Sequence, residues 1–523
     1  MINILLGIGG TGAKVVESAL VLLAAGIGPE KVHVGLIDQD GSNGNVIRTQ
    51  TLLADLAGFR RDWRRTGVAN AIDWDHDGRP DFGALDIELL FDEDEKALWC
   101  PSQTQASLRT IVGENLSPEQ RDLFDLLFMR GDQEQDLPLD KGYRGRAHVG
   151  ATAMLAAILD ENDNKLRARL IELMQAADRE PVNVFLVGSA FGGTGASGFP
   201  TLARALRKWT TSGDFKNKGK VSIGGMLMLP YFSFKEPPEG SLAVVTPDEI
   251  LPKTRLALEY YENLFQHEDV FDRFYVAGWE DFFSLGYHVP GGVGQANPAM
   301  LPELLAATAT IDFFTRDNME AAREKEEANA TGVPVMVSAR EDKAVKWRDM
   351  PIPTHQVEAR LGQMLRFCVY WRYVAEPNLH KASTFGGIGD NWTQKLVNGV
   401  KPADSTGELN SLNKLVDDVL LWAATIEATG KAFWKNGPWD LTRLHNPQHQ
   451  PDPTRPIALL KAPTPEVVFK SIDHLIRDDH GHYLTGVAHT MHDELTRGRS
   501  QFHGDHKGIG RAVAAVYASS RLR

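Results

Sequence analysis

The sequence predicts an α/β fold in which a parallel sheet with its helices is followed by a mostly helical C-terminal part. Two strand–glycine loop–helix units predict the sheet, one starting at residue 2 and the other at residue 182. From about residue 340 onward, apolar residues recur at helical spacing, as in LGQMLRFCVYWRYV (361–374), which predicts helices. A chain of 523 residues is too long for one ordinary core, so we expect two or three domains.

Composition excludes several classes of protein. A hydrophobic content of 42% and a charged content of 24% are typical of a soluble globular protein, and a net charge of −13 argues against general nucleic-acid binding. Cys100 and Cys368 are too few for a disulfide scaffold or a cysteine zinc site. No run approaches the roughly 18 apolar residues of a membrane helix, and a strand that starts at residue 2 leaves no room for a signal peptide. We therefore expect a cytoplasmic protein without a membrane span.

The N-terminal unit carries a candidate phosphate loop. Its elements are a strand at 2–6, the loop GIGGTG at 7–12, a helix at 13–25 that Gly26 ends, and a strand at 31–37. Glycine lets the backbone approach a phosphate closely, and free N–H groups at a helix start attract its charge. Asp38 and Asp40 follow the second strand, at a position that lies beside the ligand crevice in folds of this kind. A tight strand-to-helix turn is the alternative interpretation of the loop.

The second unit repeats this arrangement. It consists of a strand at 182–187, the turn FGGTGASG at 191–198, a helix at 199–209 with Pro200 in its first turn, and a strand at 221–229. In a parallel sheet both glycine loops open at the same edge. Two sets of backbone amides that face one crevice can hold a polyphosphate from two sides.

The second loop resembles the signature loop of the tubulin and FtsZ superfamily, in which GGGTG is followed by small residues. Here it consists of Gly192, Gly193, Thr194 and Gly195, followed by Ala196 and Ser197. Four other segments are similar to superfamily segments in the same order: GIGGTGAK (7–14), LIDQD (36–40), GYRGRAHVG (142–150) and MLMLPYFSF (226–234). The similarity covers roughly residues 1–320, and the pair GIGGTG and GGTGASG is most similar to divergent bacterial tubulin-like proteins.

The resemblance implies a division of the chain into three parts. Residues 1–296 would form a tubulin-like GTP-binding domain with an insertion at about 50–141, and residues 297–316 the central helix. Residues 317–523 would form a divergent C-terminal domain, in which we expect helices at 356–374, 411–429, 465–477 and 507–522 and a short strand at 333–338.

The resemblance also implies a ligand, GTP or GDP, with Mg²⁺ as an additional candidate. The residues implied to contact the α- and β-phosphates are Gly10, Thr11, Gly12 and Ala13. Those implied to hold the β- and γ-phosphates are Gly193, Thr194 and Gly195, and Gly9 and Gly192 are implied to bind the nucleotide beside them. Gly145, Arg146 and Ala147 would lie by the γ-phosphate, where a cation suits its charge, although Arg144 and Arg146 also fit a solvated surface pair. Asp38 and Asp40 would lie near the ribose, a phosphate or a magnesium-bound water.

Base recognition and hydrolysis are less well supported by the residues. Asn297 is the candidate for reading the base edge, but it also fits a helix N-cap with Pro298 at the first helical position. In the superfamily an acidic loop of the neighbouring subunit completes the catalytic site, and Asp317 and Glu320 are the nearest acids here. The segment lacks the Asn-x-Asp-x-x-Asp pattern of FtsZ, and a solvated charged helix explains it better than a catalytic role does.

Two motifs suggest metals without completing a site. DWDHDGRPD, from Asp73 to Asp81, starts like a calcium loop, but its twelfth position is Ala84 instead of a bidentate glutamate. His489, His492 and Asp493 fit one helix face without clearly assembling a zinc site. No metal ligands are therefore assigned.

Three functions remain open. The first is GTP-dependent self-assembly or a switch, with a GTPase completed between subunits. The second is a scaffold that keeps its nucleotide uncleaved and has protein partners in a bacterial multi-protein system. The third is a Rossmann-type dinucleotide or adenylating enzyme, with Arg48 as the arginine that binds ATP. The third leaves FGGTGASG without a role.

Overall fold

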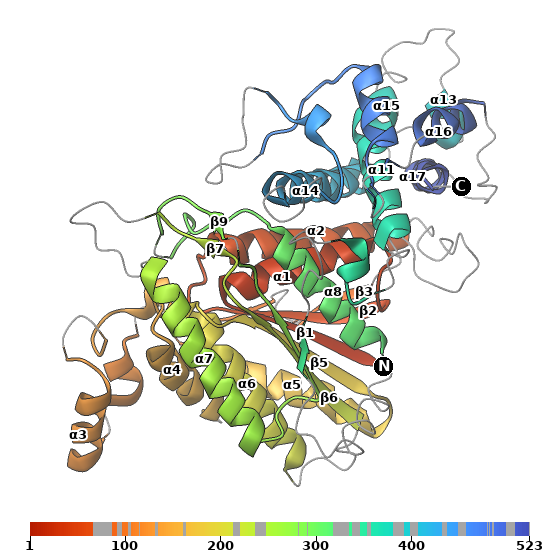
Figure 1. Cartoon of the computed structure of the whole chain (residues 1–523). Helices are drawn as coiled ribbons and strands as arrows, with labels where there is room; N and C mark the ends of the chain where they lie inside the picture. The colour runs from red at the N-terminus through yellow and green to blue at the C-terminus, as the bar shows by residue number, and fades with distance from the viewer. Residues whose placement is uncertain are drawn as a thin grey trace.

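The architecture is taken from a computed structural model (Figure 1). The residues described are 1–65, 86–91, 97–102, 106–113, 116–130, 134–160, 164–212, 220–235, 247–280, 282–289, 291–316, 334–336, 346–352, 357–379, 392–397, 406–430, 437–447, 457–477, 480, 482–483, 486–497 and 508–521. In this part of the chain, no helix is both long and apolar enough to cross a membrane.

A parallel sheet forms the centre of the molecule. Its strands are β1 (Ile2–Ile8), β2 (Lys31–Ile37), β3 (Asp86–Leu89), β4 (Leu98–Trp99), β5 (Val182–Ser189), β6 (Val221–Met228), β8 (Arg273–Ala277) and β10 (Pro334–Met336). Their spatial order is β10-β8-β6-β5-β1-β2-β3, and β4 also pairs with β2. The chain runs outward from β1 in one direction and from β5 in the other. The strand order therefore reverses between β1 and β5, and open α/β sheets bind ligands at such a point.

Helices cover both faces of the sheet. The strands alternate between the faces: Leu5, Phe185 and Met226 belong to one core, and Leu6, Leu186 and Leu227 to the other. The first face carries α1 (Gly9–Ala24), α2 (Gly44–Arg65) and α8 (Leu301–Thr315). The second face carries α4 (Ala147–Leu159), α5 (Lys165–Gln175), α6 (Gly193–Thr211) and α7 (Pro247–His267).

The C-terminal part is mostly helical, as predicted, and packs on the outer side of α1, α2 and α8 (Figure 1). Its helices are η7 (Trp347–Asp349), η8 (Val357–Leu361), α11 (Gly362–Tyr370), η9 (Trp371–Ala375), α13 (Trp392–Val397), α14 (Thr406–Gly430), η11 (Thr442–Leu444), α15 (Pro465–Asp473), α16 (Val487–Thr496) and α17 (Gly508–Ser519). The indole of Trp422 donates to the hydroxyl of Ser18 over 3.1 Å, and the hydroxyl of Thr429 donates to the carbonyl of Ala299 over 2.9 Å. As a result α8 is buried between the sheet and the C-terminal helices.

Three helices begin elsewhere than the sequence predicts. Helix α1 begins at Gly9 and α6 at Gly193, so the glycines form first turns, and Pro200 lies inside α6. Helix α8 begins at Leu301, with Met300 at the N-cap position. The N-cap interpretation of Asn297 is therefore wrong. Its backbone N–H donates to the side chain of Asn45 over 2.8 Å instead, and its carbonyl accepts from the guanidinium of Arg48 over 2.9 Å.

The predicted insertion at 50–141 is partly built into the sheet. Strands β3 and β4 both pair with β2, and the range also contains η3 (Arg109–Gly113), α3 (Pro118–Leu127) and η4 (Leu139–Lys141). Ser117 caps α3 through the backbone N–H of Gln120. Near the site, β7 (Phe232–Ser233) pairs with β9 (Phe283–Ser284), and η5 (Ala176–Asp178) leads into β5.

Candidate functional site

The two glycine turns lie against each other where the strand order reverses. Strand β1 runs directly into α1 at Gly9, and β5 is followed by the turn into α6 at Gly193. A Cβ atom built on Gly9 would lie 2.9 Å from the backbone nitrogen of Gly195, and Gly9 has a φ of +74°. Position 9 thus requires glycine, and a Cβ atom on Gly195 would itself lie 2.8 Å from the backbone nitrogen of Ser189. The first N–H groups of a helix have no acceptor inside it, so the contact brings two sets of unpaired amides together.

A third loop, within the segment 142–150, joins the two glycine turns. A Cβ atom on Gly193 would lie 3.1 Å from the backbone nitrogen of Gly145 and 3.3 Å from that of Arg144. Arg144 and Gly145 both have positive φ, which turns their backbone toward α6. The buried side chain of Tyr143 holds the loop in place, because its hydroxyl donates to Gln39 over 3.4 Å, just beyond the end of β2.

These loops surround a cavity of about 120 Å³. Eleven of the residues that the sequence predicts as nucleotide ligands line it: Gly9, Gly10, Thr11, Asp38, Asp40, Gly145, Gly192, Gly193, Thr194, Gly195 and Asn297. Residues far apart in the chain therefore meet at one site, as expected for a cleft at the carboxyl ends of parallel strands.

Four predicted ligands do not line the cavity. A Cβ atom on Gly12 would lie 2.6 Å from the carbonyl of Val187, so this glycine permits close packing of α1 on β5. Ala13 belongs to the core. Arg146 and Ala147 line a different groove, and Arg144 lies at the cavity in their place. The predicted catalytic residues Asp317 and Glu320 lie outside the described residues, as does the Asp73–Asp81 motif.

Asp38 is a buried carboxylate at the floor of the cavity. Its Oδ1 accepts from the hydroxyl of Thr194 over 2.9 Å and from the backbone N–H of Asp40 over 3.1 Å. Its Oδ2 accepts from the side-chain amide of Asn43 over 3.3 Å. Burial raises the pKa of Asp38 to about 7, the charge of Asp40 acts in the same direction, and the hydrogen bonds oppose the shift. Near neutral pH Asp38 is therefore partly protonated.

Asp40 holds the segment before α8 against the cavity. Its Oδ1 accepts from the hydroxyl of Ser42 over 2.7 Å, and its Oδ2 accepts from the backbone N–H of Gly292 over 2.6 Å. Gly291 and Gly292 both have positive φ, which forms a tight turn over the cavity. The segment before α8 is therefore held at the site by a carboxylate that itself lines the cavity.

Lys14 is a cavity residue that the sequence did not single out. It lies on α1, is almost fully buried, and forms an ion pair with Glu303 at the start of α8. The hydroxyl of Tyr231 donates to the same carboxylate over 2.5 Å, and the Lys14 ammonium lies 5.7 Å from the centre of the Tyr231 ring. Burial lowers the pKa of Lys14, while the charge of Glu303 opposes the shift. Its position two residues after GIGGTG was the available signal.

A set of side-chain amides forms another wall, made of Asn43, Asn45, Gln295 and Asn297. The amide of Asn43 donates to the side-chain carbonyl of Gln295 over 3.2 Å, and the side-chain carbonyl of Asn45 accepts from the backbone of Asn297. These groups offer both donors and acceptors. The sequence favours Asn297 among these four residues and does not indicate Asn43 or Asn45, because these two meet it through the fold alone.

The acidic pair fits Mg²⁺. Asp38 and Asp40 supply the carboxylate oxygens that this ion prefers, and Mg²⁺ is commonly bound by one or two carboxylates together with phosphates and waters. Among the residues whose positions are described, no group of three or more His, Cys, Asp or Glu side chains could hold a metal ion alone. Of the histidines considered for zinc, His492 forms a hydrogen bond of 2.7 Å from its Nδ1 to the hydroxyl of Tyr370, and His489 packs against Phe469.

Arg48 does not line the cavity, and its guanidinium binds other residues of the chain. Its guanidinium forms two hydrogen bonds with the carboxylate of Glu17, of 2.7 and 2.8 Å, and a third with the carbonyl of Asn297. This arginine therefore braces α2 against α1 and against the segment before α8. The geometry gives no support to the role in ATP binding that the adenylating alternative requires.

Comparison of the chain with known protein families, with curated proteins and with solved structures found no match. What the cavity binds must therefore be inferred from its own geometry and chemistry.

Proposed function

We propose that the cavity binds the phosphate groups of a guanine nucleotide, GTP or GDP, and that the nucleotide controls self-assembly of the protein. One observation carries the proposal: the turn at Gly9 touches the turn at Gly195, and the amides of the third loop lie beside Gly193. Bare backbone N–H groups from three loops suit the size and charge of a polyphosphate. They also lie where the strand order reverses, the usual position of a ligand in an open α/β sheet.

The charges around the cavity support a phosphate ligand with Mg²⁺. Lys14, Lys141 and Arg144 line the cavity, and Glu303 and Asp140 pair with the first and the last of them. Asp38 and Asp40 would repel a phosphate on their own. An ion held between the two carboxylates and the phosphates removes this repulsion. Mg²⁺ would thus neutralise charge and orient the phosphates, while the chain's own amides bind them.

The size of the cavity has a consequence for binding. Its 120 Å³ is well below the roughly 300–1,000 Å³ of sites that enclose a whole small molecule. The nucleoside part therefore requires the segment at 291–297 to move away from α2. The bond of 2.6 Å from Gly292 to Asp40 is the contact that a nucleotide and its ion would replace.

Guanine is favoured by the resemblance to tubulin and FtsZ. The side-chain amides of Asn43, Gln295 and Asn297 are compatible with it, since a guanine edge presents both donors and acceptors. A scaffold that retains its nucleotide without cleaving it remains the alternative. An adenylating enzyme is disfavoured because Arg48 is held by Glu17.

Extraction of nucleotide from the purified protein tests the proposal. We expect mass spectrometry to identify GDP or GTP, and calorimetry to show binding of GDP to the stripped protein in the presence of Mg²⁺. Thr194→Ala should weaken retention, because it removes the hydroxyl that joins the phosphate turn to Asp38. Thr210→Ala is the matched control, since it removes another buried hydroxyl of α6 far from the cavity.

Absence of any bound purine nucleotide, together with no calorimetric signal, would refute the nucleotide proposal. Recovery of NAD or ATP would favour the enzyme alternative. Sedimentation velocity with GTP and with GDP then separates assembly from scaffolding: assembly predicts larger species with GTP, and a scaffold predicts the same sedimentation with both.

A further inference from the structure

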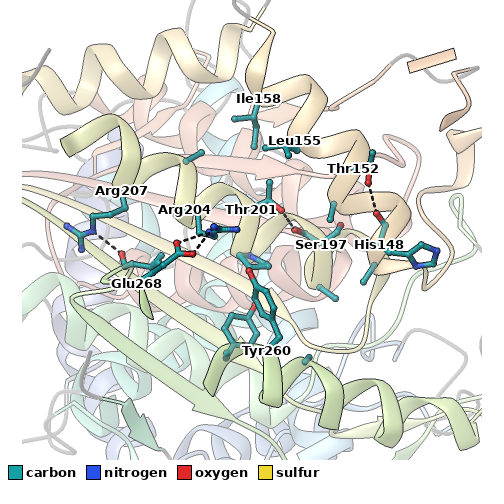
Figure 2. Close-up of a pocket in the computed structure, with 18 of the residues that line it drawn as sticks. His148, Thr152, Leu155, Ile158, Ser197, Thr201, Arg204, Arg207, Tyr260 and Glu268 are labelled. Atoms are coloured by element: carbon teal, nitrogen blue, oxygen red, sulfur yellow. Dashed lines mark hydrogen bonds and ion pairs between the residues drawn. The ribbon is translucent and has the colours of Figure 1, made fainter. Parts of the chain in front are cut away.

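A long groove runs along the outer face of α6, between α4 and α7 (Figure 2). Its volume is about 1,470 Å³, which exceeds the roughly 300–1,000 Å³ of typical small-molecule sites. In Figure 2, Leu155 and Ile158 of α4 face it from one side and Tyr260 of α7 from the other. Nothing in the proposed function uses this groove.

Small residues account for the depth of the groove. Helices α4 and α6 touch where Gly150 meets Ser197, and a Cβ atom on Gly198 would lie 2.9 Å from the side chain of Met154. Beyond that contact, the floor along α6 consists of Ala196, Pro200, Thr201 and Ala205. Pro200 has no N–H to donate to the carbonyl of Ala196, so the floor also presents a backbone acceptor.

Large apolar side chains line the walls and are left exposed to solvent. The exposed fractions are 47% for Leu155, 61% for Leu159, 66% for Leu256 and 43% for Tyr260. Single exposed leucines are common, but several that converge on one groove are typical of a protein interaction site.

The charge of the groove is opposite to that of the chain. Six basic side chains line it against two acidic ones, whereas the whole chain has a net charge of −13. The basic residues are Arg146, Arg167, Arg204, Arg207, Lys208 and Lys253. Glu268 neutralises Arg204 through two hydrogen bonds, of 2.7 and 2.9 Å, Asp272 pairs with Arg207, and Glu249 pairs with Lys253 over 2.8 Å. With Asp269, which also lines the groove, four acidic side chains stand against the six basic ones, so an excess of two positive charges remains around an apolar floor.

We propose that this groove binds an amphipathic α-helical segment of a partner protein, with leucine-like residues on one face and acidic residues beside them. A helix about 10 Å across that rises 5.4 Å per turn occupies roughly 400 Å³ per turn, so the groove accommodates about three turns. The apolar walls disfavour a nucleic acid. The positive groove on a strongly negative chain favours an acidic segment.

The groove and the nucleotide cavity share Gly145, Phe191 and Gly192. A helix in the groove therefore contacts loops that also form the cavity. Docking as such does not depend on the ligand of the cavity, so the two proposals can fail separately.

A designed probe tests the docking site. The probe is a fluorescein-labelled helical peptide of about four turns, with leucines on one face and glutamates beside them, and the comparison peptide carries lysines in place of the glutamates. By fluorescence anisotropy we expect the acidic peptide to bind at least tenfold more tightly than the basic one. Leu256→Glu should weaken binding of the acidic peptide at least tenfold, whereas Lys208→Glu should weaken the acidic peptide and strengthen the basic one.

Leu126→Glu on α3 is the matched control, because Leu126 is 81% exposed and lies outside the groove. All of these side chains are exposed, so the variants should keep the thermal unfolding midpoint of the wild type. Equal affinity for the two peptides, or wild-type binding by Leu256→Glu, would overturn the proposal. If the protein self-associates and Leu256→Glu abolishes the self-association, the occupant of the groove is a second copy of the chain. This result too would overturn the proposal of a partner helix.

Discussion

The hydroxyl of Thr194 donates a hydrogen bond of 2.9 Å to Oδ1 of Asp38. Thr194 lies in the first turn of α6, and Asp38 lies directly after β2, on the far side of β1. Both side chains are buried. One hydrogen bond therefore joins the glycine turn of the second unit to the acidic pair of the first, and the protonation of Asp38 is coupled to the geometry of the cavity.

Asp38 should make the stability of the protein depend on pH. Its pKa of about 7 in the folded state lies above the roughly 3.9 of an unfolded chain. Between these values the folded protein holds a proton that the unfolded chain has released. The contribution of Asp38 to the free energy of unfolding therefore falls as pH rises from about 4 to about 7. Over the whole range this free energy changes by roughly 4 kcal/mol. Thermal unfolding midpoints of the wild type and Asp38→Asn across this range should diverge, with the variant gaining relative stability as pH rises.

Thr194→Ala sharpens this test. The hydroxyl of Thr194 stabilises the ionised carboxylate, so its removal should raise the pKa of Asp38 further. The pH at which the unfolding midpoint departs from that of Asp38→Asn should therefore move upward. Thr210→Ala should leave the wild-type profile unchanged. Parallel pH profiles of the wild type and Asp38→Asn would show that Asp38 does not titrate in this range.

Cys100 offers a chemical probe of the same charges. Its sulfur lies beside the turn after β2, 3.4 Å from where a Cβ atom on Gly41 would stand. Although Cys100 is exposed as a residue, partial desolvation of its sulfur, together with the charges of Asp38 and Asp40, raises the pKa of Cys100 to about 11. The thiolate is the reactive form, so alkylation at about pH 8 should be at least roughly tenfold slower than that of a free cysteine.

Mass spectrometry of the iodoacetamide reaction measures this rate. Asp40→Asn should accelerate it by removing a negative charge, and Mg²⁺ bound between the carboxylates should have the same effect. Cys368 is buried, so Cys100→Ser identifies the signal. A rate equal to that of a cysteine peptide would contradict the expected electrostatic effect.

Gly9→Ala should damage the site and the stability of the protein together. The positive φ of Gly9 costs another residue about 1–2 kcal/mol, and the new methyl group would press on the backbone of Gly195. We expect loss of GDP binding and a lower unfolding midpoint. In contrast, Gly58→Ala should stabilise α2 by roughly 0.5–1 kcal/mol, because a Cβ atom there meets only Arg61 at 3.9 Å. Wild-type binding by Gly9→Ala would show that close approach of the two turns is unnecessary.

The parallel core of the fold could be predicted from the sequence. Strand β2 has its predicted bounds, and β1, β5 and β6 differ from theirs by one or two residues. Continuous apolar runs reveal buried strands directly. The starts of α1 and α6 could not be predicted, because glycine has a low helix propensity and only the contact between the two turns holds it in a first turn.

Side-chain placement at the site was less predictable. Arg144 lines the cavity and Arg146 does not, because the positive φ of Arg144 and Gly145 redirects the third loop. No local pattern reveals such a turn when a non-glycine residue adopts it. Likewise, no local pattern around Lys14 indicates its partner Glu303, since the two residues are brought together by α1 and α8, which lie far apart in the sequence.

The pair of Lys14 and Glu303 should be strongly coupled. Lys14→Met leaves the Glu303 carboxylate buried without its cation, and such a loss typically costs roughly 3–5 kcal/mol. In Lys14→Met/Glu303→Gln no charge stays buried, and the hydroxyl of Tyr231 still has an oxygen acceptor, so the double variant should cost less than the sum of the single ones. A double-mutant cycle by urea unfolding should give a coupling of about 1–3 kcal/mol. The exposed pair of Lys470 and Glu466, changed in the same way, should give less than about 0.5 kcal/mol. Equal coupling in the two cycles would mean that the pair beside the cavity is as solvated as one on the surface.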